Sequence, residues 1–129
     1  MQPTTLIHRL YDDVLSAHRL ELLAELASPE VRAALEGPLT ALLAAFPDLR
    51  YTLTDVVAEG NRVAVRWTWT GTHRAAFRSH AATGKVVTNA GFAIYTVERD
   101  RIAAVVMETD RLGFLEQIGA AGRAIAPEH

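Results

Sequence analysis

The most constraining feature of the sequence is a strand-like alternation near its middle. In segment 62–73, large apolar residues take every second position: Val63, Val65, Trp67 and Trp69 share one face, and Arg66, Thr68 and Thr70 share the other. Side chains of a β-strand alternate between the two faces of its sheet, so this pattern predicts a strand with one buried face. The chain must therefore build a sheet and cover one side of it.

Three other segments are predicted as strands, at residues 51–58, 86–97 and 102–109. They are rich in the β-branched and aromatic residues that strands favour. Glu59-Gly60-Asn61 and Arg99-Asp100 supply turns, while residues 74–85 form an irregular connection. Strands joined in this order predict an antiparallel meander.

The first half of the chain is predicted as helical. Apolar residues recur at three- and four-residue spacing in segment 6–15, which is typical of an amphipathic helix, and Thr4 or Thr5 is expected to cap it. A shorter helical piece follows at residues 20–26. Ser28-Pro29 then places a capping residue before a proline, which predicts the start of another helix.

Glycines and prolines predict where the helices end. We expect Gly37-Pro38 to interrupt the third helix and Pro47 to stop its continuation, because proline cannot continue the hydrogen-bond ladder. Asp110 is expected to cap a closing helix that ends at Gly119. Helices followed by an antiparallel sheet predict the α+β class.

Length and composition limit the classes of function. A chain of 129 residues is expected to form one domain, which we assign to residues 1–120, with a loosely ordered tail at 121–129. A net charge of −2 does not indicate a nucleic-acid partner. The absence of cysteine, of His-x-x-x-His spacing and of phosphate or dinucleotide fingerprints leads us to expect no metal and no cofactor. No segment reads as a signal peptide or membrane span, so we expect a cytoplasmic protein without membrane contact.

Several short motifs together resemble the SnoaL-like polyketide cyclases, a branch of the nuclear transport factor 2-like fold. They cover most of the chain from about Phe46 to Ala120: Phe46-Pro47-Asp48-Leu49, residues 57–67, Gly71-Thr72-His73, Thr83-Gly84-Lys85, Gly91, Asp110-Arg111-Leu112-Gly113 and residues 115–119. The resemblance implies a cone, in which a strongly curved antiparallel sheet surrounds a pocket, N-terminal helices close one side and a short C-terminal helix follows. It also implies ring closure in aromatic polyketides by an intramolecular aldol step, although relatives in the wider fold isomerise, dehydrate or only bind.

The sequence departs from this family at the positions of the site. In the cyclases a general acid/base carboxylate lies in the last strand, three positions before the aspartate that opens the final helix, and Met107 takes that place here. Another polar or acidic residue often follows two positions after the glycine of the preceding strand, and the match is Ala93. Neither side chain transfers protons. The segment before Phe46 is also shorter than usual.

Three polar side chains are expected to point into such a pocket. From the parity of the strands, His73 shares a face with Trp67, while Asn89 and Tyr95 are in phase with Gly91. His73 would act as acid or base near neutral pH, and the other two would donate hydrogen bonds to a ligand carbonyl. Each also has a structural interpretation, as a solvated or backbone-bonded histidine, a sheet asparagine or a core tyrosine, and a one-residue bulge would invert the parity.

The remaining candidates have strong structural alternatives. Asp110 completes the catalytic candidates, although capping the final helix is its simpler role. The substrate-binding candidates are expected to stack on a flat ligand or simply to pack as core: Trp67, Trp69, Met107 and Ala93. Arg66 and Arg78 could meet an acidic ligand group, and a solvated or interfacial arginine is the alternative.

The leading hypothesis is a small-molecule pocket protein of polyketide-type secondary metabolism. It would be an enzyme of the cyclase or isomerase type that shapes a hydrophobic, polycyclic substrate and donates hydrogen bonds to it. The alternative is a non-catalytic ligand-binding or accessory protein of the same fold. In either case we expect a homodimer or larger assembly, because open sheets of this kind leave an apolar outer face.

Overall fold

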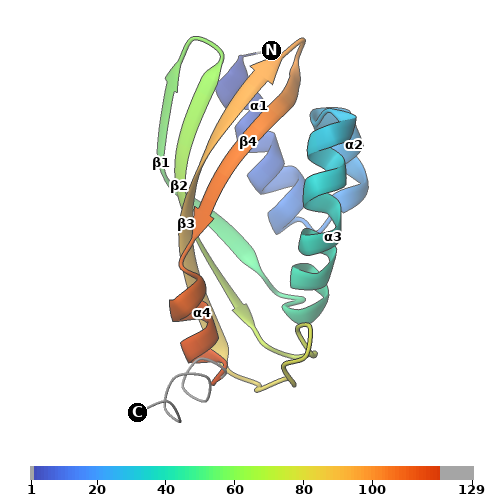
Figure 1. The fold of residues 1–129 in the computed structure, drawn as a ribbon, viewed down its shortest axis with the longest axis vertical. Coiled ribbons are helices and arrows are strands. Elements are labelled where there is room, and N and C mark those ends of the chain that lie inside the picture. The colour runs from blue at the N-terminus through green and yellow to red at the C-terminus, as the bar shows by residue number, and fades with distance from the viewer. Residues whose placement is uncertain (1, 120–129) are drawn as a thin grey trace.

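The structure, a computed structural model, describes residues 2–119 and has two layers (Figure 1). A curved antiparallel sheet forms one layer, and the N-terminal helices lie together along one face of it. The predicted α+β class is therefore confirmed, and so is the order of helices before strands. The tail predicted at residues 121–129 lies outside the described residues.

The sheet is a four-stranded meander in which each strand pairs only with its neighbours in sequence. Its strands are β1 (Arg50–Glu59), β2 (Arg62–Thr72), β3 (Val86–Glu98) and β4 (Arg101–Thr109), in the order β1-β2-β3-β4. Register shifts occur between Leu53 and Asp55 of β1 and between Thr96 and Val97 of β3. Such irregularities increase the local twist and bend of a sheet.

The alternation of β2 is present in the structure as it was predicted. Its apolar residues Val63, Val65, Trp67 and Trp69 are all buried, and the residues between them are partly or fully exposed. The pairing of Ala93 with Val65 and with Met107 keeps three neighbouring strands in phase. The buried face of the sheet is therefore the face that the helices cover.

The N-terminal helix begins one residue earlier than its expected cap. Helix α1 (Pro3–Arg9) starts with Pro3 at its first position, and Gln2 precedes it without a side-chain capping bond. The predicted threonine caps are therefore wrong, because proline, which lacks an N–H, already suits the first turn. The chain continues directly into η1 (Leu10–Ser16), a π-helical stretch.

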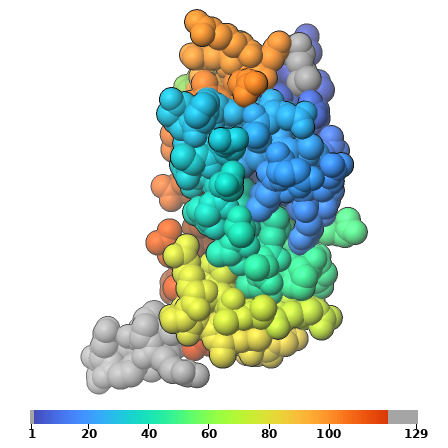
Figure 2. All heavy atoms as spheres, turned by 90° about the vertical axis from the view of Figure 1, so that its right-hand side faces the viewer, coloured from blue at the N-terminus to red at the C-terminus, as the bar shows by residue number. Residues whose placement is uncertain are grey.

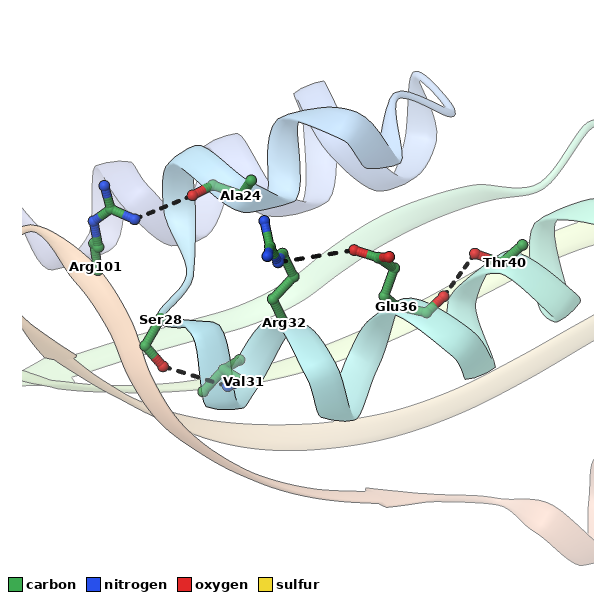
Figure 3. Close-up of polar contacts among 7 residues, drawn as sticks. All are labelled: Ala24, Ser28, Val31, Arg32, Glu36, Thr40 and Arg101. Carbon is green, nitrogen blue, oxygen red and sulfur yellow. Dashed lines mark hydrogen bonds and ion pairs between the residues drawn. The ribbon is translucent and has the colours of Figure 1, made fainter.

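Helix α3 (Pro29–Ala45) is the longest helix, and it runs through the proline that was expected to break it. It follows the short helices η2 (Leu20–Leu22) and α2 (Leu23–Leu26). The Ser28 side chain accepts a hydrogen bond from the Val31 backbone N–H, as predicted (Figure 3).

The expected interruption at Gly37-Pro38 is wrong, and the position of this pair explains why. The carbonyl that Pro38 leaves without a donor belongs to Ala34, which is exposed, so water can replace the missing N–H. Across this pair, the Thr40 hydroxyl donates to the Glu36 carbonyl over 2.7 Å (Figure 3).

The closing helix α4 (Arg111–Gln117) follows β4 directly. Asp110 caps it as predicted, since its Oδ1 accepts the Gly113 N–H over 2.9 Å. Gln117 joins α4 to β3 by donating to the Thr88 carbonyl and accepting from the Thr88 N–H. Among residues 2–119, no helix is long and apolar enough to cross a membrane.

The surface opposite the sheet is continuous in the space-filling view (Figure 2). The strands around the turn between β3 and β4, shown in orange, lie at the top, helical segments in blue and cyan cover the part below, and the connection between β2 and β3, shown in yellow, covers the lower part. This connection is joined to the end of β2, because His73 and Lys85 share a backbone hydrogen bond and Gly84 donates to the His73 carbonyl.

Candidate functional site

A cavity of about 570 Å³ lies between the sheet and the helical layer. All four strands, η1, α3, α4 and the connection between β2 and β3 contribute to its wall. The helical layer supplies mainly aliphatic side chains: Leu10, Leu15, Leu35, Leu39 and Leu42. A space of this size and composition suits a small, largely apolar organic molecule.

All three tyrosines of the chain lie on the cavity wall. The hydroxyl oxygens of Tyr11 and Tyr95 are 2.6 Å apart, which is a short hydrogen bond for two hydroxyls. The Tyr51 ring packs edge-on against Tyr11, with 5.3 Å between the ring centroids. Tyr11 belongs to the π-helical stretch η1, a conformation that is frequent at functional sites.

Burial keeps these tyrosines neutral. It raises the pKa of Tyr11 far above the ordinary range, with a further contribution from the nearby Tyr95, and it raises the pKa of Tyr51. The pKa of Tyr95 is raised to about 12, because burial outweighs the hydrogen bond with Tyr11. The tyrosines can therefore donate hydrogen bonds at neutral pH, and they cannot serve there as phenolate bases.

The sheet side of the wall also holds two buried polar atoms without partners. Trp67 Nε1 and Asn89 Oδ1 have no hydrogen-bond partner among the described residues, and both side chains line the cavity. Gly91 lets Trp67 lie close to the neighbouring strand, since a Cβ at Gly91 would stand 2.5 Å from Trp67 Cζ2. A ligand that hydrogen-bonded to either atom would remove the cost of leaving it unpaired.

One end of the cavity carries two arginines and a histidine. Arg78 and His80 come from the connection between β2 and β3, and Arg111 comes from the start of α4. The Arg78 guanidinium lies 5.4 Å from the centre of the Phe77 ring, which is within cation–π range. No aspartate or glutamate lines the described cavity.

Met107 lies on the cavity wall, and its side chain is 39% exposed. Trp69 lies on the wall as well, whereas Ala93 is buried behind it. The structure thus brings five candidates from the sequence to one cavity: Trp67, Trp69, Arg78, Asn89 and Tyr95. Met107 joins them at the place where the resemblance implies a carboxylate.

His73 is fully buried outside the cavity wall. Its ring stacks on Phe46, and Nδ1 accepts the Thr83 backbone N–H over 3.3 Å. The Nε2 atom has no hydrogen-bond partner within the described part of the chain. Burial, with a smaller effect of His80, lowers the pKa of His73. His73 is thus placed to hold the connection between β2 and β3, and it does not reach a ligand.

Asp110 does not reach the cavity wall either. Its carboxylate is occupied by the cap of α4, and Glu108 is exposed on the strand before it. The structure therefore separates both of these carboxylates, and His73, from the space where a ligand would lie.

The wall also includes polar residues that the sequence analysis does not identify as site residues, among them Tyr11, Tyr51, His80 and Arg111. Tyr11 was assigned to the apolar face of the first helix, and its hydroxyl was the available signal, because a buried tyrosine hydroxyl usually has a partner. Arg111 lies at the cavity because of the path that the chain takes after β4, and His80 because of the path that it takes after β2. No local pattern indicates such a position.

Comparison with known proteins points to one family. A family model described as SnoaL-like polyketide cyclase matches residues 5–118. IdmH from Streptomyces antibioticus, a proposed polyketide cyclase, is 27% identical with a TM-score of 0.80, and the match covers 92% of this chain and 99% of IdmH. A comparison with curated proteins gave no match.

Two further solved structures share the fold at lower identity. A proposed polyketide cyclase from Acidithiobacillus ferrooxidans is 24% identical with a TM-score of 0.79, covering 92% of this chain and 95% of that one. AclR from Streptomyces galilaeus, a proposed hydroxylase, is 21% identical with a TM-score of 0.83, covering 91% and 95%.

Proposed function

The chain belongs to the SnoaL-like polyketide cyclase family, and we propose that it acts on a polyketide-type small molecule in the cavity between its sheet and its helices. The reaction would be a cyclisation or isomerisation of an apolar, ring-forming substrate. The observation that carries the proposal is the cavity of about 570 Å³ with an aromatic wall and a buried pair of hydroxyls. The likeness to IdmH, a proposed polyketide cyclase, supports the same substrate class.

The hydroxyl pair provides a donor for a developing negative charge. Tyr11 and Tyr95 share one hydrogen bond, so one of their two protons remains for a ligand oxygen. The indole N–H of Trp67, which has no partner among the described residues, would be a second donor from the same wall. Donors held in place before the reaction stabilise an enolate oxygen more than they stabilise the ground-state carbonyl.

We further propose that Met107 replaces the acid/base carboxylate of the family. Catalysis would then rest on holding the substrate in a reactive conformation, which can contribute on the order of 7 kcal/mol or more in favourable cases. This suits a substrate that already tends to cyclise, because the enzyme needs only to select one folded conformation. It also suits a wall without carboxylates in the described cavity.

The test uses a synthetic aryl poly-β-ketone that cyclises slowly by itself through an intramolecular aldol reaction. The protein should raise the rate of cyclisation or shift the ratio of the cyclic products. In the Tyr95→Phe variant, this acceleration or shift should be smaller by a factor of at least about ten. Arg32→Gln is the control, since Arg32 pairs with Glu36 on the outside of α3 (Figure 3). Unchanged rates and ratios with the unmodified protein would remove the support for catalysis.

A second candidate function is ligand binding without catalysis. Met107 at the carboxylate position favours it, because no group of the described wall is an evident strong base. The same experiment separates the two functions. If the poly-β-ketone quenches the tryptophan fluorescence at low concentration while its cyclisation is unaltered, the protein binds and does not catalyse.

We also propose that two copies of the chain associate through the outer face of the sheet. One apolar residue from each strand forms a row across this face: Val57, Ala64, Ile94 and Val106. Phe92 lies beside the row and is 55% exposed, and Val106 is 63% exposed. An apolar surface of this kind is usually covered in a stable protein, and a second copy of the same face would do so with two-fold symmetry.

A further inference from the structure

The charges around the cavity are distributed unlike those of the whole chain. The sequence has 15 acidic and 13 basic residues, excluding histidine. Yet the described wall contains Arg78, His80 and Arg111 and neither aspartate nor glutamate. The wall of the cavity thus carries two arginine charges without an acidic partner, in a chain that is slightly acidic overall.

The two arginines belong to the same end of the cavity, although 33 positions of sequence separate them. The ring centroids of Phe77 and Phe114 are 5.3 Å apart, which joins the connection after β2 to helix α4. Arg78 follows Phe77 directly, and Arg111 precedes Phe114 by about one helical turn. Phe77, Phe114 and both arginines all line the cavity.

Neither arginine is explained by an ion pair. The ion pairs of the described residues use Arg9, Arg19, Arg32 and Arg66. Asp110 stands next to Arg111 in sequence, yet its carboxylate turns back to the Gly113 N–H. The guanidinium groups of Arg78 and Arg111 are therefore available to an anion from solution.

Both arginines also occupy positions that are locally unfavourable for an arginine. Arg78 has a φ of 53°, in the left-handed region that glycine and asparagine tolerate best. Arg111 is the first residue of α4, where the helix dipole disfavours a positive charge. The two arginines therefore do not stabilise the loop or the helix in which they lie. Residues in such unfavourable positions often belong to binding sites.

We infer that the ligand of this cavity is an apolar ring system bearing a carboxylate, and that Arg78 and Arg111 hold this carboxylate at the end of the cavity that they share. The inference rests on the proposed function, whose substrate class it narrows. Guanidinium groups bind carboxylates through paired charge-assisted hydrogen bonds. The rings would lie against Trp67 and Trp69.

The remaining polar groups fit the other parts of such a ligand. Asn89 and Tyr95 are six residues apart on β3, which corresponds to about 20 Å of extended strand. The cavity is therefore long enough to separate a carboxylate at one end from a carbonyl oxygen near the tyrosine pair. Asn89 Oδ1 would accept a hydrogen bond from a ligand hydroxyl that lies between this carboxylate and this carbonyl oxygen.

The test compares two probes with the same rings, 2-naphthoic acid and methyl 2-naphthoate, at pH 7.5. The acid is ionised there, and the ester is neutral. Calorimetry gives the affinities. Tryptophan fluorescence reports the place of binding, because the two tryptophans of the chain both line the cavity. We expect the acid to bind about ten-fold more tightly or better, with the preference decreasing as salt rises.

Two variants and a control assign the preference to the arginines. Arg78→Gln and Arg111→Gln should each remove most of the preference for the acid and leave ester binding unchanged, while Arg32→Gln should alter neither. The inference would be overturned if the acid and the ester bound with equal affinity, or if both variants kept the preference for the acid. Either result would still be consistent with a cavity that binds apolar ligands. Failure of both probes to bind would count against the proposed function itself.

Discussion

The hydroxyl oxygens of Tyr11 and Tyr95 lie 2.6 Å apart, and they join residues 84 positions apart in the chain. Tyr11 belongs to the helical layer and Tyr95 to β3, so this hydrogen bond connects the two layers of the fold across the cavity. Both residues are only 1% exposed. The pair therefore contributes to stability as well as to the proposed site.

Removal of either hydroxyl should destabilise the protein. Tyr11→Phe and Tyr95→Phe should each lower the free energy of unfolding by about 1–2 kcal/mol, because each leaves a buried hydroxyl without its partner. The double variant should cost less than the sum of the two, since the second change removes the orphaned group. Urea unfolding measures all three. Tyr51→Phe is the matched control, and additive losses would contradict the shared bond.

In an alkaline titration of the folded protein, no tyrosine should ionise near the ordinary tyrosine pKa. All three tyrosines have raised pKa values, and that of Tyr95 is raised to about 12. The neutral forms stabilise the folded state fully below the unfolded pKa of about 10, and this stability is lost progressively as pH rises from there through the raised folded-state pKa values. Phenolate absorbance at 295 nm should thus appear together with loss of circular dichroism. Phenolate formation near pH 10 in folded protein would show that a tyrosine is not buried as described.

Acidification should destabilise the fold through His73. Its pKa is lowered by burial in the folded state, so the unfolded chain takes up a proton first as pH falls below about 6.5. His73→Asn keeps an acceptor near the place of Nδ1 and removes the titration. Between pH 7.5 and 5.5, the melting temperature of the unmodified protein should fall more than that of the variant. Parallel curves would exclude His73 as a source of acid sensitivity.

A methyl group at Gly91 should disturb the cavity wall. A Cβ there would stand 2.5 Å from both the Glu108 carbonyl oxygen and Trp67 Cζ2. Gly91→Ala should cost about 1–3 kcal/mol of stability through overpacking and shift the tryptophan emission. Gly37→Ala is the control, because nothing lies within 4 Å of its Cβ position and alanine favours helix by about 1 kcal/mol. Equal effects of the two variants would contradict the close contact with Trp67.

The outer face of the sheet should hold two copies together. Light scattering should give twice the mass of one chain, and Val106→Lys should give the mass of one, because a charge would be buried in the apolar row, at its β4 end. Val86→Lys is the control, since Val86 is similarly exposed (67%) and lies eight residues from Ile94 on β3. A monomeric mass for the unmodified protein at micromolar concentration would refute the proposed dimer.

Most of the fold could be predicted from local patterns in the sequence. The alternation from Val63 to Trp69 located a strand and its buried face, and Ser28 and Asp110 marked the starts of two helices. The same reasoning failed at Gly37-Pro38, where exposure lets a helix tolerate a missing hydrogen bond. It also failed at Thr4 and Thr5, because Pro3 already starts the helix.

The site was less predictable because it is built from distant segments. Strand parity placed Asn89 and Tyr95 on the wall, since parity is a local property. His73 has the parity of Trp67, yet it lies beyond the end of β2 and is covered by Phe46 and Thr83. Arg111 and Tyr11 depend on how α4 and η1 dock onto the sheet, which is a tertiary property that no spacing in the sequence encodes.

The meander order of the sheet has a consequence for the speed and order of folding. Each strand finds its partner next to it in sequence, so β1 to β4 can assemble through successive hairpins with little loop-closure entropy. The bond between Tyr11 and Tyr95 must instead close a loop of more than 80 residues. The cavity should accordingly be completed after the transition state, with low φ-values for Tyr11 and higher ones for the strand pairings. Substitutions at the cavity wall would then mainly accelerate unfolding and leave the folding rate almost unchanged.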